Sequence, residues 1–105
     1  MESEHIFHIA QKSEWQAAET GNVYTGESLK NDGFIHCCFR EQVDQVLRQW
    51  FAGIDNLLLI EIDSQEVNAE IRIENLEGGS QKFPHIYGPL NLNAVINVSE
   101  INKFG

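Results

Sequence analysis

The chain has 105 residues, and its 16 acidic and 7 basic side chains give a formal net charge of −9 at pH 7. This excess of negative charge argues against binding to nucleic acid, which depends on lysine and arginine contacts to phosphates, and against docking on an anionic membrane. The sequence has no run of about 20 apolar residues, and it begins without the basic segment of a secretory signal. We therefore expect one cytoplasmic domain over residues 1–105, with no nucleic-acid or membrane partner.

The first third of the chain predicts a strand, a helix and a turn-rich stretch. Residues 6–10, "IFHIA", alternate in polarity and predict a strand. Ser13 and Gln16 have the spacing of a capping box, which predicts a short helix that ends near Gly21. Turn-forming residues dominate 22–33, so this stretch is expected to be a loop with one turn of helix around Glu27 to Lys30.

The middle of the chain contains the strongest helical pattern. Residues 34–39, "FIHCCF", predict a second strand, and residues 56–63, "NLLLIEID", predict a third that is apolar enough to be central. Between them, residues 40–53 predict a helix with a glycine at its end. The apolar side chains of this helix recur every three or four positions, at Val43, Val46, Leu47, Trp50 and Phe51.

The last third of the chain predicts strands. Residues 68–75 alternate strictly and are followed by a turn at 76–81. Residues 82–92, "KFPHIYGPLNL", contain two prolines and are expected to form an edge strand or an ordered loop. Residues 93–101 predict a final strand. Two helices early and most strands late favour an α+β fold with mainly antiparallel strands.

The stretch "GFIHCCF", residues 33–39, places polar side chains in an apolar strand. A period of two puts His36 and Cys38 on one face and Ile35 and Cys37 on the other. A structural disulfide between the adjacent cysteines is not expected, because neighbours on a strand point in opposite directions. Both thiols are therefore predicted to be reduced, with Cys37 on a core face and Cys38 on the histidine side.

The segment "FPHIYGPLN" predicts the wall of a pocket. Its prolines and glycine fix the backbone, and the fixed backbone presents His85 and Tyr87 on one face. Glu74 ends the preceding strand just before a Gly-Gly turn, so it can approach His85. We predict that His36, Glu74, His85 and Tyr87 converge in a small-molecule site, with His8 behind them.

Other interpretations of these residues stay open. A single strand histidine is commonly structural, and buried cysteines are commonly inert. The residue types at His36, Cys38, His85 and Glu74 would suit zinc, but their spacing matches no standard zinc framework, so no metal is predicted. A cysteine–histidine nucleophile pair lacks a local signature as well.

The same motifs carry a resemblance to a known family. "GFIHC", "IRIEN" and "FPHIYGPL", within a match from Ile6 to about Val98, resemble the small bacterial and plant proteins called domain of unknown function nine-five-two. The chain departs from the family pattern at Cys38, where serine is usual. The resemblance implies a compact α+β fold similar to ADP-ribosyltransferases and RNA 2′-phosphotransferases, in which two small sheets enclose a cleft for NAD or a related nucleotide.

The resemblance also implies roles for particular residues. Catalytic roles fall to Glu74, which would stabilise positive charge on the reacting sugar, to His36, which would contact a ribose hydroxyl, and to His85 as an acid–base group. Ligand binding falls to Tyr87, Cys38, Arg72 and His8, with Arg72 and Arg40 as the nearest cations for phosphate. NAD would be a substrate, and no cofactor is implied.

Three functions are therefore expected as alternatives. The first is a transferase or hydrolase that acts on NAD or another ribose-containing small molecule. The second is a non-catalytic module that binds such a molecule, and the third is a metal-dependent or thiol-dependent hydrolase. The sequence indicates neither the substrate nor the oligomeric state.

Overall fold

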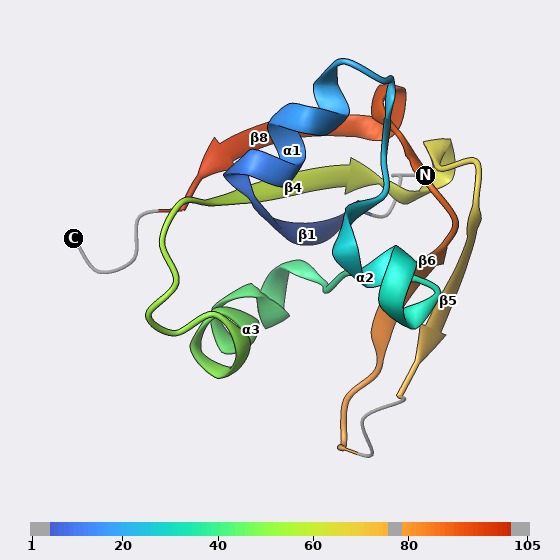
Figure 1. The fold of residues 1–105 in the computed structure, drawn as a ribbon. Helices are drawn as coiled ribbons and strands as arrows, with labels where there is room; N and C mark the ends of the chain where they lie inside the picture. Colours follow the sequence, from blue (N-terminus) through green and yellow to red (C-terminus); the bar gives the residue numbers. More distant parts are fainter. Residues whose placement is uncertain (1–4, 76–78, 102–105) are drawn as a thin grey trace.

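The computed structural model describes residues 5–75 and 79–101 and shows an α+β fold with small antiparallel sheets and three short helices (Figure 1). The helices are α1 (Lys12–Glu19), α2 (Gly26–Asp32) and α3 (Val43–Trp50). The strands are β1 (His5–Gln11), β2 (Val23–Tyr24), β3 (Ile35–His36), β4 (Leu57–Asp63), β5 (Glu70–Glu74), β6 (Phe83–Tyr87), β7 (Leu90–Asn91) and β8 (Val95–Glu100). Short 3-10 turns occur at Arg40–Gln42, Ser64–Glu66 and Leu92–Ala94.

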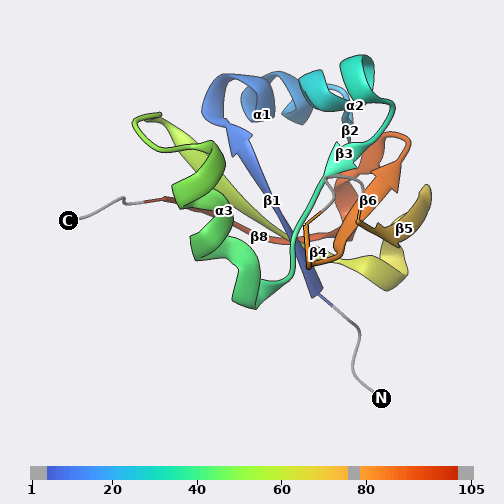
Figure 2. The same ribbon diagram turned by 90° about the horizontal axis from the view of Figure 1, so that it is seen from below.

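The strands form three sheets in which every described pair is antiparallel. The first sheet has the order β1-β4-β8, the second pairs β2 with β7, and the third has the order β3-β6-β5. The prediction of a central third strand is confirmed, because β4 pairs with β1 on one side and β8 on the other. Figure 1 shows α1 above β1 and α3 below it, whereas α2 lies beside β6. Figure 2 shows α2 beside β2 and β3.

Two predictions in the first third of the chain are wrong. The helix α1 begins at Lys12 directly after β1, so Gln11 is its N-cap and the predicted capping box of Ser13 with Gln16 does not start it. The stretch predicted as a loop contains the short strand β2, and the single turn predicted around Glu27 to Lys30 is part of the longer, seven-residue helix α2. The glycine Gly33, at φ +87°, ends α2 and donates its N–H to the carbonyl of Leu29, as a left-handed C-terminal residue does.

The prediction of an edge position for "FPHIY" is wrong, because β6 is the central strand of its sheet. In the register of β3 with β6, the next pair after His36 and His85 is Cys37 with Pro84. The N–H of Cys37 donates to the carbonyl of Pro84 at 3.0 Å, but proline has no N–H to donate in return. The ladder ends there, so β3 is shorter than the predicted strand and Cys38 pairs with Phe7 of β1 instead.

The core lies between the sheets and under α1. It is built from side chains of β1, β3, β4, β6 and β7 together with α1. Its buried members include Ile6, Trp15, Ile35, Ile60, Ile62, Ile86 and Leu90. The helix α3 contributes no fully buried residue, and Trp50 at its end is 62% exposed. The apolar face of α3, the strongest predicted from the sequence, is therefore not buried in the core. No helix in the described parts of the chain is long and apolar enough to cross a membrane.

Candidate small-molecule site

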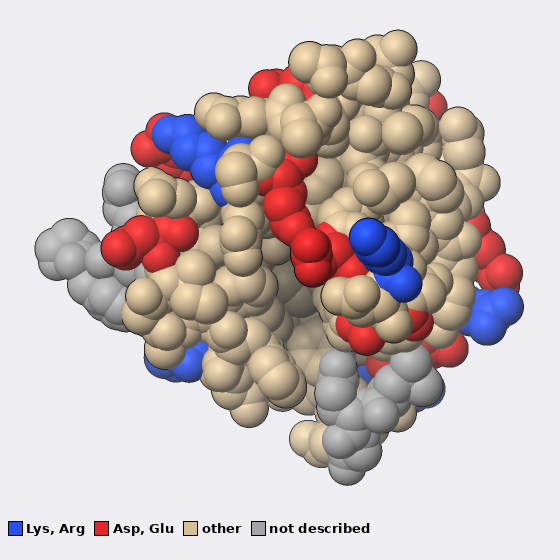
Figure 3. All heavy atoms as spheres, in the orientation of Figure 1, with Lys and Arg blue, Asp and Glu red and all other residues tan. Residues whose placement is uncertain are grey.

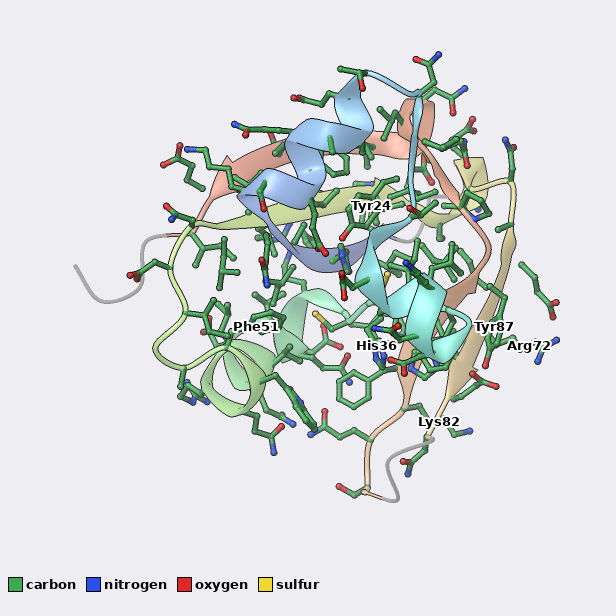
Figure 4. The ribbon with its side chains drawn as sticks, in the orientation of Figure 1. Tyr24, His36, Phe51, Arg72, Lys82 and Tyr87 are labelled. Atoms are coloured by element: carbon green, nitrogen blue, oxygen red, sulfur yellow. The ribbon has the colours of Figure 1, made fainter. Side chains whose placement is uncertain are left out.

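A cavity of about 620 Å³ lies where the first and third sheets meet the three helices. All three helices contribute to its wall, as do the strands β1, β2, β3 and β6. Its lining residues are Phe7, His8, Ile9, Gln11, Glu14, Tyr24, Glu27, Ser28, Asp32, His36, Cys37, Cys38, Val46, Trp50, Phe51, Phe83 and His85. Figure 3 shows a hollow in the face that carries α2 and α3. Figure 4 shows Tyr24, His36 and Phe51 on three sides of this region.

Glu74 joins His85 and Tyr87 in a hydrogen-bonded group along one face of the third sheet. Its Oε1 lies 2.9 Å from Nδ1 of His85 and 2.7 Å from the hydroxyl of Tyr87. These two hydrogen bonds lower the pKa of Glu74, and the bond to Glu74 raises the pKa of Tyr87. A carboxylate can only accept hydrogen bonds, so Nδ1 of His85 carries a hydrogen and donates a hydrogen bond to Glu74.

The other nitrogen of His85 is the unusual atom of the site. The His85 side chain is completely buried, and its Nε2 has no hydrogen-bond partner among the described residues. Because Nδ1 is fixed as a donor, Nε2 of the neutral ring is an acceptor. A buried polar atom without a partner costs free energy, so a ligand group that bonds this atom would be favoured.

His36 pairs directly with His85 across the third sheet and shares its face. The two rings meet edge to face with centroids 5.6 Å apart, and Phe34 stacks on His85 at 4.2 Å. The side chain of His36 is 44% exposed, and its Nε2 lies 2.9 Å from a carboxylate oxygen of Asp32. His36 is therefore a half-exposed residue of the cavity wall.

His8 and Tyr24 form a second fixed pair on the opposite side of the cavity. Nδ1 of His8 donates to the backbone carbonyl of His36 at 2.6 Å, and the Tyr24 hydroxyl lies 2.8 Å from Nε2. Burial lowers the pKa of His8 to about 4, so the ring is neutral near pH 7. Nε2 must then accept a hydrogen bond from the Tyr24 hydroxyl, and the Tyr24 oxygen can only accept hydrogen bonds from other partners. Burial, with Glu14 nearby, also raises the pKa of Tyr24.

The two cysteines are free and buried, and both line the cavity. Cys37 belongs to the core cluster as well, as predicted. Burial raises the pKa of Cys37 and raises that of Cys38 to about 12. Because the thiolate is the nucleophile, these shifts argue against thiol catalysis.

The buried thiols give a direct test of this part of the structure. A chromogenic disulfide reagent should find two thiols per chain in urea, but should react with the folded protein at least about 100-fold more slowly at pH near 8, since little thiolate forms. Absorbance during labelling measures both rates. A thiol in the folded protein that reacts as fast as in urea would contradict the burial of Cys38.

The arginines singled out in the sequence do not line the cavity. Arg72 pairs with His85 across β5 and β6 and shares its face of the sheet, but its side chain lies over the Tyr87 ring at 4.4 Å and bonds Glu70. Arg40 lies over Phe7 at 4.8 Å with Glu61 at 3.7 Å. In the described chain no lysine or arginine side chain is among the lining residues, whereas Glu14, Glu27 and Asp32 are.

The structure therefore brings the predicted residues together in part. His36, His85, Cys38 and His8 line the cavity, but Glu74 and Tyr87 lie behind His85 and do not. Sequence reasoning missed the contributions of α1, α2 and α3, which have no motif. The apolar face of α3 was the available signal, because Val46, Trp50 and Phe51 face the cavity instead of the core. No group of three or more histidine, cysteine, aspartate or glutamate side chains among the described residues is suited to hold a metal ion.

Comparison with known proteins identifies the family. Residues 9–98 match the family described as "Protein of unknown function (DUF952)", and the chain belongs to this family. It is also similar to protein CC0527 from Caulobacter crescentus, with 29% sequence identity over 93% of this chain and 86% of that one in the crystal structure, which superposes with a TM-score of 0.84. The solution NMR structure of the same protein superposes with a TM-score of 0.80. No curated protein matches the chain.

Proposed function

We propose that the protein is an enzyme of the ADP-ribosyltransferase-like class that cleaves or transfers at the bond between ribose and base in a nucleotide or other ribose-containing small molecule. The observation that carries this proposal is His85, whose Nδ1 is held by Glu74 and whose Nε2 is buried without a partner among the described residues, in the wall of a ligand-sized cavity. A histidine oriented by a carboxylate is a common arrangement for acid–base chemistry.

The geometry supports a different division of roles from the one expected from the sequence. Glu74 holds His85 and would stabilise its protonated ring, which makes Glu74 a positioning residue. The carboxylates that face the cavity come from the helices, and Glu14 is the most sheltered of them. Positive charge that builds on a ribose as its bond to a base breaks would be stabilised by these carboxylates.

The proposed hydrolysis can be written with all atoms accounted for. The electrons of the bond between C1 of ribose and the base nitrogen leave with the base. The oxygen of a water molecule bonds C1, and Nε2 of His85 accepts the proton that this water loses. In transfer, the hydroxyl of an acceptor molecule takes the place of water.

Nicotinamide release from NAD and from nicotinamide riboside tests the proposal. The wild-type protein should turn over at least one of the two, and His85→Asn should lower turnover by about 100-fold or more. Asparagine keeps a donor near the position of Nδ1 for Glu74 and removes Nε2. The control is His5→Asn, because His5 is exposed, pairs with Glu61 outside the cavity and should not affect turnover.

A second variant covers the case in which His85→Asn does not fold. His36→Ala removes a half-exposed side chain, so the free energy of unfolding should change by less than about 1 kcal/mol, whereas ligand binding should be lost. Binding of both compounds without turnover by the wild-type protein would contradict catalysis and favour a binding module. Loss of stability without loss of binding in His36→Ala would contradict the site.

A further inference from the structure

We infer that the ligand of this cavity is an aromatic compound rich in hydrogen-bond donors and neutral or positively charged, such as a cationic nucleoside, and that it carries no diphosphate. This inference rests on the proposed function and narrows its substrate class. It contrasts with NAD, the substrate implied by the family resemblance.

The polar atoms that the cavity offers are mainly acceptors. The Tyr24 hydroxyl donates to His8, so its oxygen can only accept from a ligand. Nε2 of His85 in the neutral ring is likewise an acceptor, because Nδ1 donates to Glu74. Gln11, Ser28 and His36, and more weakly the thiols of Cys37 and Cys38, are lining side chains that can both donate and accept. Hydroxyl, amino or charged N–H groups therefore complement the Tyr24 oxygen and Nε2 of His85, and phosphate oxygens do not.

The lining residues of the cavity include aspartate and glutamate but no lysine or arginine among the described residues. Glu14, Glu27 and Asp32 come from two helices, and Figure 3 shows acidic side chains along the edge of the hollow. Lys30 lies on α2 between two of these residues, but it is exposed and not among the lining residues. A unit charge on a ligand about 8 Å from one carboxylate changes the affinity of that ligand by about five-fold at an effective dielectric constant of about 40. A diphosphate would meet this repulsion from several carboxylates, whereas a cation would gain.

Aromatic side chains provide the apolar part of the complementarity. Trp50 is 62% exposed and lines the cavity together with Phe51 and Phe83. An exposed tryptophan at the mouth of a cavity can stack on a planar ring, and a cationic ring would gain further from the electron-rich face. The bound ligand would then cover the apolar face of α3 that lines the cavity.

Calorimetric titration of the wild-type protein with nicotinamide riboside, nicotinamide mononucleotide and NAD tests this inference. These probes share one cationic ring and ribose; the mononucleotide adds one phosphate, and NAD adds a diphosphate and an adenosine, so the step from riboside to mononucleotide isolates the effect of phosphate. At low ionic strength the riboside should bind at least about ten-fold more tightly than NAD, with the mononucleotide between them. Glu27→Gln should weaken riboside binding by about five-fold. Glu66→Gln is the matched control, because Glu66 is also exposed but does not line the cavity.

The possible results separate the two proposals. NAD binding as tight as or tighter than the riboside would overturn the inference and leave the proposed function in place. Equal effects of Glu27→Gln and Glu66→Gln would also overturn it, because the cavity carboxylates would not be the source of selectivity. No binding of any probe, together with no nicotinamide release, would overturn the proposed function and this inference with it.

Discussion

Replacement of Ile86 by alanine should lower the free energy of unfolding by about 3–4 kcal/mol, within the range measured for large-to-small changes in packed cores. Ile86 has no exposed surface, and it lies on the central strand β6 between Ile35 of β3 and Ile71 of β5. Its side chain packs into the core on the face opposite to His85. The truncation would leave a cavity that two hydrogen-bonded neighbouring strands prevent from closing.

The matched control is Ile73→Ala, which makes the same chemical change in the same sheet. Ile73 lies on β5 and is 50% exposed, so its truncation should cost less than about 1 kcal/mol. Urea unfolding followed by circular dichroism measures both variants. Similar losses for the two variants would contradict the central position of β6 and favour the edge strand that the sequence predicts.

Strands and helices with regular periodicity could be predicted from the sequence. The apolar run of β4 indicates a strand buried on both faces, and the spacing of apolar residues in α3 is clearly helical. Only one turn of α2, around Glu27 to Lys30, could be predicted, because Gly26, Asn31 and Asp32 at its ends are poor helix formers and Leu29 is its single apolar residue. It is held by its position beside β3 and by the glycine at its end.

The central position of β6 could not be predicted from the sequence because the strand contains Pro84. Proline normally excludes a central strand, since it removes a hydrogen bond from the ladder. Here the missing bond falls where β3 ends and the chain crosses to β1, so the cost is confined to one position. This tertiary arrangement is not visible in the sequence around Pro84.

The candidate site could be predicted only where strand alternation and turns determine it. The proximity of Glu74, His85 and Tyr87 follows from alternation in two strands joined by a turn, and the structure brings these residues into contact. The acidic lining could not be predicted, because it depends on how the helices α1 and α2 pack over the cavity. The apolar face of α3 suggested a core contact, but its position at the cavity wall is a property of the tertiary fold.

The hydrogen bond between His8 and Tyr24 joins residues far apart in the sequence, so the sequence did not predict it either. The burial of His8 leads to the second large expected effect, on the pH dependence of stability. Lowering the pH from about 7.5 to about 5.0 should lower the free energy of unfolding by about 2 kcal/mol through His8 alone. A histidine in an unfolded chain has an ordinary pKa of 6.5, whereas the pKa of His8 in the folded protein is about 4. Between these values the unfolded chain binds more protons, so stability falls as the pH falls, by about 1.4 kcal/mol per unit of pH.

The variant His8→Asn should lose this part of the pH dependence, because asparagine does not titrate. Glu74 has a lowered pKa, so its stabilising contribution persists above its ordinary value of 4.5 and is lost at lower pH than this experiment uses. The control is His5→Asn, which removes an exposed histidine from the same strand and leaves His8 and Tyr24 in place. Urea unfolding at both pH values measures the three proteins, and NMR titration of the His8 ring in the wild-type protein measures its pKa directly. A His8 pKa at the ordinary histidine value of 6.5 would contradict the neutral, buried ring. The Tyr24 oxygen would then no longer be fixed as an acceptor, and the inferred ligand chemistry would lose one of its two acceptors.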